Sequence, residues 1–204
     1  MARRGLTRDL VMQEAISLVE EEGYENLSMR NLAKRLDVKA ASLYNHIKSV
    51  EELHTAIVIK LVNDFFKAQK DAMEGKNAED AVMSLALAYR KLANEKRGVY
   101  DLALTLPKED DKELNELRKN FSYVAMDAMD KFALTEEQKL YWQRILRVSM
   151  HGFVSLEQAG YFTNGVIDTE KSYRCTIMNI IKGLRDLEKE NRERNPEASF
   201  SANK

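Results

Sequence analysis

Residues 27–53, LSMRNLAKRLDVKAASLYNHIKSVEEL, constrain the fold of this chain more than any other segment. Ser28 stands where a cap residue begins a first amphipathic segment. A short turn then leads into a second segment, Lys39–Ile47, with small residues, an aromatic residue and amides at the positions that would face outward. Two short helices joined by a tight turn predict a helix-turn-helix, in which one helix crosses the DNA backbone and the next enters the major groove.

Basic residues surround the second predicted helix, as phosphate binding requires: Arg30, Lys34, Arg35, Lys39 and Lys48. The whole chain nevertheless has a net charge of −1. Local distribution of charge, rather than the net value, attracts nucleic acid. The acids of this region lie instead in and just after the first predicted helix: Glu14, Glu20, Glu21, Glu22 and Glu25. The net charge therefore neither supports nor excludes DNA binding.

An all-α fold of about nine helices is predicted for the 204 residues, because the chain has only two prolines and is rich in good helix formers. The predicted helices span about 7–22, 28–36, 39–47, 49–74, 77–97, 99–104, 110–132, 135–162 and 168–190. We expect a helix-turn-helix domain over 1–47, a helical effector-binding and dimerisation domain over 48–194, and a flexible tail over 195–204. The helix 49–74 joins the two domains.

The compartment predicted is the cytoplasm. No apolar stretch approaches the roughly 18–20 residues of a membrane span, and the N-terminus, MARRGLTRDL, lacks the apolar run of a signal peptide. The single cysteine, Cys175, allows no internal disulfide and fits a reducing cytosol. A small buried residue is the favoured role for Cys175, with a redox sensor as the alternative.

The helix 136–162 has apolar residues around most of its circumference, so we expect it to be buried on more than one side. Small side chains recur on it and on the last helix, which predicts half of an intermolecular four-helix bundle. The predicted interface comprises Ser149, Gly152, Leu156, Ala159, Thr176, Ile180, Gly183 and Leu184. The alternative is that both faces pack into one monomeric core. A homodimer also suits the motif, since paired heads about 34–36 Å apart contact successive major grooves.

Residues 8–54 resemble the DNA-binding head of the TetR family of bacterial transcriptional regulators. The resemblance lies in the order of a helix, a glycine, a capped helix and a Leu-Tyr-x-His segment, here LAKRLDV at 32–38 and SLYNHI at 42–47. The rest of the chain matches in helix number, helix lengths and a dimerising final pair. The segment MHGFVSLE at 150–157 resembles a His-Gly motif in one group of C-terminal domains of this family.

The resemblance implies a set of DNA contacts. Arg30 would read guanine, whose O6 and N7 match a guanidinium, while Ala40 and Ala41 would contact only thymine methyls or shape. Asn45 would meet a phosphate or reach adenine. The full predicted set is Arg3, Arg4, Ser28, Arg30, Lys39, Ala40, Ala41, Ser42, Tyr44, Asn45, His46 and Lys48.

Three residues depart from the family pattern. Asp37 replaces the usual turn glycine, but Asp tolerates the left-handed conformation. Lys39 stands where a Ser or Thr cap is common, and Val50 stands where a phosphate-binding lysine is common, with Lys48 as its substitute.

Alternatives remain for several of these residues. Arg3 and Arg4 either enter the minor groove or form a solvated terminus. Tyr44 either contacts the DNA backbone or covers the core of the head. His46 either contacts phosphate or packs against the fourth helix.

A small-molecule pocket is implied among the later helices, where Met and aromatic residues suit an apolar ligand. The predicted lining is Tyr89, Tyr100, Phe121, Met126, Trp142 and Met150. Each of these residues has an ordinary core role as the alternative. His151 is either a polar group of the pocket or, as we favour, a structural histidine.

The function predicted is a repressor that binds a palindromic operator as a homodimer and leaves it when an effector binds. The fourth helix and the 99–105 segment are the expected transmission elements. The alternatives are an effector-independent or architectural DNA-binding protein, and a helical enzyme. We expect no enzyme and no cofactor, because the histidines and the cysteine show no metal-ligand spacing, and no nucleophile motif or phosphate loop appears.

Overall fold

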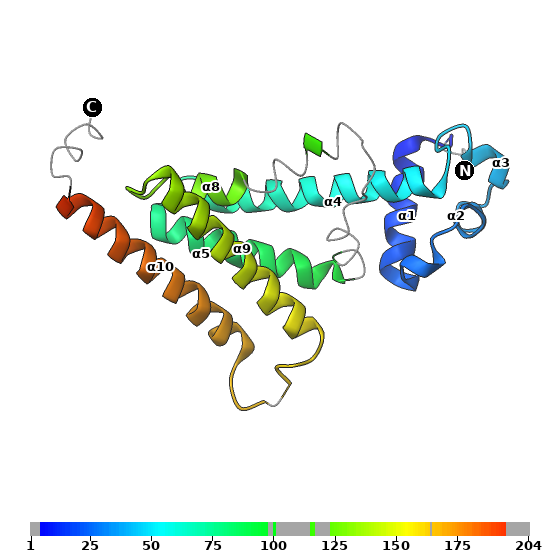
Figure 1. Ribbon diagram of the computed structural model, residues 1–204. Helices are drawn as coiled ribbons and strands as arrows, with labels where there is room; N and C mark the ends of the chain where they lie inside the picture. The colour runs from blue at the N-terminus through cyan, green and yellow to red at the C-terminus, as the bar shows by residue number, and fades with distance from the viewer. Residues whose placement is uncertain (1–4, 98–99, 101–114, 117–122, 164, 195–204) are drawn as a thin grey trace. The chain divides into compact units, whose positions relative to one another are not determined.

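The computed structural model describes residues 5–97, 100, 115–116, 123–163 and 165–194, and all regular structure within them is helical (Figure 1). The predicted all-α fold is therefore confirmed, with eight α-helices in the described part of the chain against about nine expected. The elements are α1 (Arg8–Glu22), the 3₁₀ turn η1 (Tyr24–Asn26), α2 (Met29–Arg35), α3 (Ala40–Leu43), α4 (Val50–Met73), α5 (Ala78–Glu95), α8 (Tyr123–Met129), α9 (Glu136–Gln158) and α10 (Thr169–Arg194).

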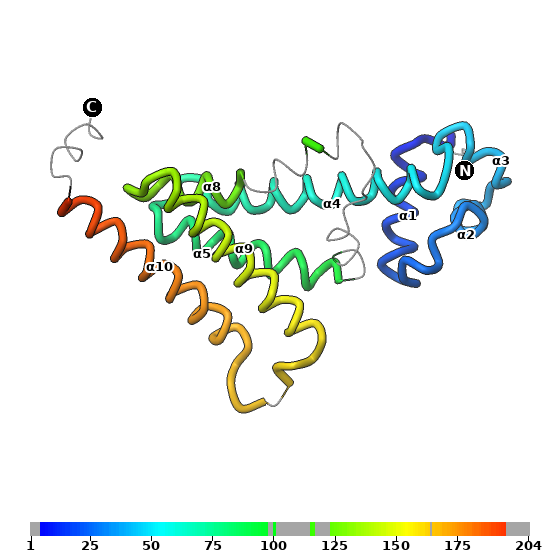
Figure 2. Tube along the Cα trace, viewed as in Figure 1, coloured from blue at the N-terminus to red at the C-terminus, as the bar shows by residue number. Residues whose placement is uncertain are grey.

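The chain divides into two compact units, which we call unit 1 and unit 2. Unit 1 comprises Met1–Asp64 and Glu95–Leu117, and unit 2 comprises Phe65–Asn94 and Arg118–Lys204. The long helix α4, cyan in Figure 2, contributes residues to both units. The division into 1–47 and 48–194 stays a prediction, and the tail 195–204 lies outside the described residues.

Side-chain caps begin most of the helices, as expected from the sequence. The Thr7 hydroxyl accepts from the Leu10 N–H at 3.2 Å, and Thr135 forms a complete capping box with Gln138. Ser49 accepts from the Glu52 N–H at 3.1 Å, but the Glu52 carboxylate accepts from the N–H of Lys48 instead of that of Ser49. The Ser-x-x-Glu sequence at 49–52 would allow a capping box, and only half of it is formed.

The core of unit 1 is built from the residues that helical spacing points inward. Residues fully or almost fully buried are Val11, Ala15, Leu18, Val19, Leu32, Ala33, Leu43, Ile47, Leu53 and Ile57. The third helix is shorter than the predicted Lys39–Ile47, and a turn follows it in which the Leu43 carbonyl accepts from the N–H groups of both His46 and Ile47, at 2.8 and 2.9 Å. This turn brings Ile47 into the core.

The core of unit 2 joins α5, α8, α9, α10 and the end of α4. Its buried members include Val82, Leu85, Ala128, Met129, Leu146, Met150, Tyr173, Ile177, Ile181 and Leu184. The helices α9 and α10 run antiparallel beside each other (Figure 1). The buried Tyr173 hydroxyl donates to the Ala86 carbonyl oxygen at 2.7 Å, which fixes α10 against α5.

None of the described helices has both the length and the apolarity that a membrane crossing needs.

Candidate nucleic-acid interface

The helix α2 separates a buried face from a basic one. Met29, Leu32 and Ala33 are buried, while Arg30 and Lys34 are exposed. Ser28 is half-buried and begins the helix by accepting from the Asn31 N–H at 3.1 Å. The Asn31 side chain in turn donates to the Asn26 carbonyl oxygen at 2.8 Å, a support that sequence reasoning did not anticipate. The start of α2 is therefore held in place by these hydrogen bonds, while Arg30 and Lys34 remain exposed.

The turn between α2 and α3 has the conformation expected for it. Asp37 has a φ of 52°, in the left-handed region, and it is the only described residue other than glycine with a positive φ. The Val38 N–H donates to the Ala33 carbonyl oxygen at 3.0 Å and closes the turn. The prediction that Asp37 preserves the turn is confirmed, since a short polar side chain tolerates this conformation better than most.

The helix α3 presents small and polar side chains to solvent. Ala40, Ala41, Tyr44 and Asn45 are exposed, and Tyr44 has 54% of its surface accessible. Tyr44 therefore points away from the core of unit 1, against the alternative that it covers that core. Ser42 and His46 are half-buried, whereas the neighbouring Leu43 and Ile47 are fully buried.

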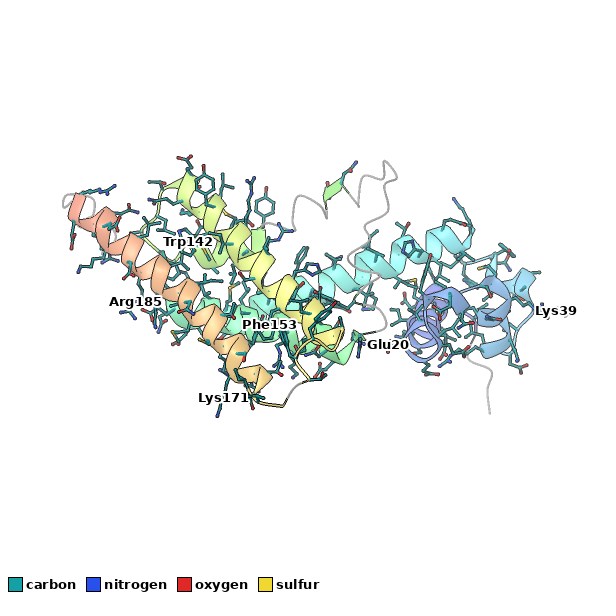
Figure 3. All side chains as sticks on the ribbon, turned by 60° about the horizontal axis from the view of Figure 1, so that its bottom comes forward. Glu20, Lys39, Trp142, Phe153, Lys171 and Arg185 are labelled. Atoms are coloured by element: carbon teal, nitrogen blue, oxygen red, sulfur yellow. The ribbon has the colours of Figure 1, made fainter. Side chains whose placement is uncertain are left out.

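Lys39 precedes α3 and forms no side-chain cap, as the departure from the family pattern implied. It lies on the surface of unit 1 (Figure 3). We call the exposed residues Arg30, Lys34, Lys39, Ala40, Ala41, Tyr44, Asn45 and Lys48 the α2–α3 surface.

The four cations of the α2–α3 surface, Arg30, Lys34, Lys39 and Lys48, belong to no ion pair within the described residues. Cations in this state are hydrated and available to phosphates. Arg3 and Arg4, the predicted arm, lie outside the described residues.

Arg35 does not belong with these cations, which corrects the expectation that it binds phosphate. Its Nε donates to Glu14 at 2.9 Å, and its two terminal nitrogens donate to the Glu21 carboxylate at 2.8 Å each. The hydrogen bonds with Glu21 and Glu14 raise the pKa of Arg35, and the hydrogen bond from Arg35 lowers the pKa of Glu21. Arg35 thus ties α2 to α1. Sequence spacing gave no sign of this, because the partners are 14 and 21 residues away.

A second polar junction lies where α3 leads into α4. One Glu52 oxygen accepts from the Lys48 N–H at 2.7 Å, and the other accepts from the Arg8 guanidinium at 3.3 Å. Glu52 therefore links the segment after α3 to the first turn of α1. Its carboxylate holds the edge of the α2–α3 surface in place.

The predicted pocket residues have different environments. Met150 is a buried member of the unit 2 core, and Tyr89 packs edge-on against Phe65 with ring centroids 5.6 Å apart. Trp142 packs partly buried against the same core, and Met126 is half-buried. Tyr100 is buried in unit 1, while Phe121 and the remainder of the 99–105 segment lie outside the described residues.

A polar cluster joins α5, α9 and α10 beside these residues. Arg90 donates from Nε to Glu157 at 2.9 Å, Asn94 donates to the same carboxylate at 3.3 Å, and the Arg90 guanidinium lies over the Tyr173 ring. Burial opposes the charged form of Glu157, but the hydrogen bonds from Arg90 and Asn94 outweigh it and keep its pKa below the usual range. Its partner Arg90 has a raised pKa, mainly through the hydrogen bond with Glu157. The pair is therefore charged and holds three helices together.

The outward side of α9 exposes a run of apolar residues. Tyr141, Ile145, Val148 and Leu156 are 44–71% exposed and recur at helical spacing with Gly152 and Ala159. We call these six residues the α9 stripe. Ile145 and Val148 were not among the predicted interface residues. The apolar residues around most of the circumference of this helix are the sequence feature that could have identified them.

Three predicted interface residues serve the chain's own packing. Leu184 is fully buried and Ile180 almost so, both in the core of unit 2. A Cβ atom at Gly183 would overlap the Trp142 ring, so Gly183 allows the close approach of α9 to α10. Ser149 and Thr176 are half-buried, and the Thr176 hydroxyl donates to the Ser172 carbonyl oxygen. Cys175, expected to be buried, is exposed, because α10 directs Tyr173 and Ile177 inward instead.

Comparison with known families and proteins gives concordant matches. Residues 11–57 match the model described as bacterial regulatory proteins of the tetR family, and residues 82–179 match a tetracyclin repressor-like C-terminal domain. An uncharacterised HTH-type transcriptional regulator of Mycobacterium tuberculosis is 28% identical, over 88% of this chain and 82% of that protein. The HTH-type regulator YobS of Bacillus subtilis is also 28% identical, over 89% and 94%.

Solved structures share the fold. Apo ActR from Streptomyces coelicolor superposes with a TM-score of 0.67 at 20% identity, covering 93% of this chain and 99% of that one. A TetR variant from Acinetobacter baumannii in complex with minocycline gives a TM-score of 0.65 at 18% identity, covering 90% and 99%.

Proposed function

Because the chain belongs to the TetR family of transcriptional regulators and contains its DNA-binding helix-turn-helix, we propose that it is a repressor. It binds a palindromic operator as a homodimer in the cytoplasm and leaves that operator when a small molecule binds. The observation that carries the proposal is the α2–α3 surface, where cations free of ion pairs surround small, exposed side chains on a fully packed scaffold.

The proposed DNA contacts divide by chemistry. Arg30 reads guanine through two parallel hydrogen bonds, and Ala40 and Ala41 lie against thymine methyls. Tyr44 and Asn45 contact the backbone or an adenine edge. Lys39 and Lys48 bind phosphates, which sets register and affinity rather than sequence. Ser28, Ser42, His46 and the arm residues Arg3 and Arg4 complete the proposed contact set.

The proposed homodimer forms through the α9 stripe. Ile145 and Val148 are 44% and 71% exposed in the single chain. Covering them with a second copy removes apolar surface from water, which favours association. Gly152 and Ala159 let the partner helix approach closely, and Ser149 on α9 and Thr176 on α10 belong to the same proposed interface. A twofold axis through this stripe would pair two heads, as a palindromic operator requires.

The proposed effector is a small molecule, since a protein of the same fold has been solved with minocycline bound. Tyr89, Met126 and Trp142 are half-buried in unit 2 and are the proposed lining in the described part of the chain. The effector shifts DNA binding only to the extent that it binds the two conformational states with different affinities. The helix α4 is the proposed transmission element, because it contributes to both units.

The test is selection of bound duplexes from a random pool, repeated with candidate small molecules. We expect one enriched palindrome, with Arg30→Ala losing preference at a guanine of each half-site. A Lys171→Gln variant is the matched control, since Lys171 is an exposed cation of unit 2. Failure to enrich any duplex with the wild-type chain would overturn the proposal. Enrichment that no small molecule reduces would overturn the effector part alone.

A further inference from the structure

A cavity of about 620 Å³ lies in unit 1 between α1 and the first half of α4. Its size is within the range of about 300–1,000 Å³ that small-molecule sites occupy. Among the described residues, the lining comes from α1 and α4: Arg8, Asp9, Met12, Gln13, Glu52, Thr55, Ala56, Ile59 and Lys60. This cavity shares no lining residue with the effector pocket proposed in unit 2, so a ligand can occupy it whether or not that pocket binds one.

The lining combines an apolar surface with a charged rim. Met12, Ala56 and Ile59 are half-buried and supply apolar surface from both helices. A polarisable thioether such as that of Met12 adapts to ligands of different shape. An occupant therefore needs an apolar body.

The rim charges are unequally compensated. Arg8 pairs with Glu52 at 3.3 Å, and Lys60 pairs with Asp64 at 3.2 Å, so both cations of the rim already have carboxylate partners. Asp9, by contrast, has no cation within ion-pair distance among the described residues. The uncompensated charge of the rim is thus negative, which favours a positively charged occupant.

We infer that this cavity binds an amphipathic organic cation, an amine or quaternary ammonium group attached to an apolar body. The cationic group pairs with Asp9, and the body packs on Met12, Ala56 and Ile59. Glu52 lines the same cavity while accepting from the Lys48 N–H at the edge of the α2–α3 surface. A ligand in the cavity therefore changes the environment of Lys48 through Glu52.

The test is a titration of the full-length protein with benzyltrimethylammonium chloride, followed by NMR of the methionine methyl groups and of the Lys48 amide. The Met12 signal, assigned with a Met12→Leu variant, should shift saturably, and the Lys48 amide should shift in parallel. Asp9→Asn should weaken binding about fivefold, the upper range for a solvent-exposed ion pair. Ala56→Phe, which fills the cavity and keeps Asp9, should abolish the shift.

Matched controls distinguish recognition of the positive charge from nonspecific apolar binding. Glu74→Gln neutralises an exposed acid that directly follows α4 and does not line the cavity, so it should leave the affinity unchanged. Sodium phenylacetate, an aromatic anion, should leave the Met12 signal in place. The other methionine signals report whether each variant keeps its fold. A Met12 signal that does not saturate, or that responds equally to phenylacetate, would overturn the site, and an unmoved Lys48 amide would overturn its link to the α2–α3 surface.

Discussion

The α2–α3 surface and the α9 stripe differ in the kind of side chain that they expose to solvent. The first exposes cations and short side chains over a scaffold in which Leu43 and Ile47 are fully buried. The second exposes Ile145 and Val148, while the charged pair of Arg90 and Glu157 beside it is only 18% exposed at either side chain. Exposed cations suit a polyanionic partner, whereas exposed apolar area costs free energy until a protein covers it. We therefore propose the first surface for DNA and the second for another copy of the chain.

The largest effect is expected at the α9 stripe. Val148→Glu should weaken the dimer roughly 100-fold or more, because a twofold interface receives the buried charge twice. Operator affinity should fall with it, since each head then binds alone. Analytical ultracentrifugation and fluorescence anisotropy with the selected duplex measure the two effects. Val166→Glu is the matched control, at 81% exposure in the α9–α10 connection. A Val148→Glu chain that stays dimeric would contradict the proposed interface.

The next effect compares two arginines of one helix. Arg30→Ala should reduce specific operator binding about 10- to 100-fold, through loss of a bidentate base contact, while thermal unfolding stays unchanged. Arg35→Ala should instead lower the unfolding midpoint, because it breaks the bonds to Glu14 and Glu21. Anisotropy and circular dichroism distinguish the outcomes. Equal DNA-binding losses in two stably folded variants would show that the assignment of Arg35 to structure is wrong.

A smaller effect tests whether Gly183, a predicted interface residue, serves packing within the chain or contact with a partner. Gly183→Ala should lower the free energy of unfolding by about 1–2 kcal/mol, as the overlap with Trp142 outweighs the helix propensity of alanine. In a Trp142→Phe background the same change should cost nothing, because the overlapping ring atoms are gone. Chemical denaturation of the four chains at one protein concentration gives the coupling free energy. A coupling near zero would mean that Gly183 contacts a partner rather than Trp142.

The smallest effect belongs to a single phosphate contact. Lys39→Gln should weaken binding a few-fold for every duplex, without changing the preferred sequence. The slope of log affinity against log salt should fall by about one for each head. Anisotropy between 50 and 200 mM salt measures this slope. A change in preferred sequence instead would assign Lys39 to base recognition.

Local chemistry made much of unit 1 predictable from the sequence. Ser28 and Thr7 are caps because a hydroxyl two or three residues before a free N–H satisfies it, whatever the rest of the chain does. Asp37 adopts its left-handed turn for an equally local reason. The inward positions of α1 and α2 follow from helical spacing alone. The end of α3 was not predicted correctly, since the helix ends at Leu43 and a turn leads to the buried Ile47.

Interactions between distant segments could not be predicted from the sequence, because several residues could have been the partner in each case. Arg35 had acids on α1 at several spacings, and only the approach of α1 to α2 selected Glu14 and Glu21. Leu184 and Val148 are both apolar residues on late helices, and only packing buried one and exposed the other. The cavity beside Asp9 likewise depends on how α1 packs against α4, since residues of both helices line it.

The sequence by itself determined the helices, their caps, the turn at Asp37 and the basic, small-residue character of the segment 27–53, because these depend on contacts within a few residues. Only the tertiary structure decided which charges remain free and which apolar residues remain exposed. Burial and ion pairing depend on which helix faces meet, and a chain offers more compatible faces than its fold uses. Arg30 is therefore exposed, whereas Arg35, five positions away on the same short helix, is paired with Glu14 and Glu21.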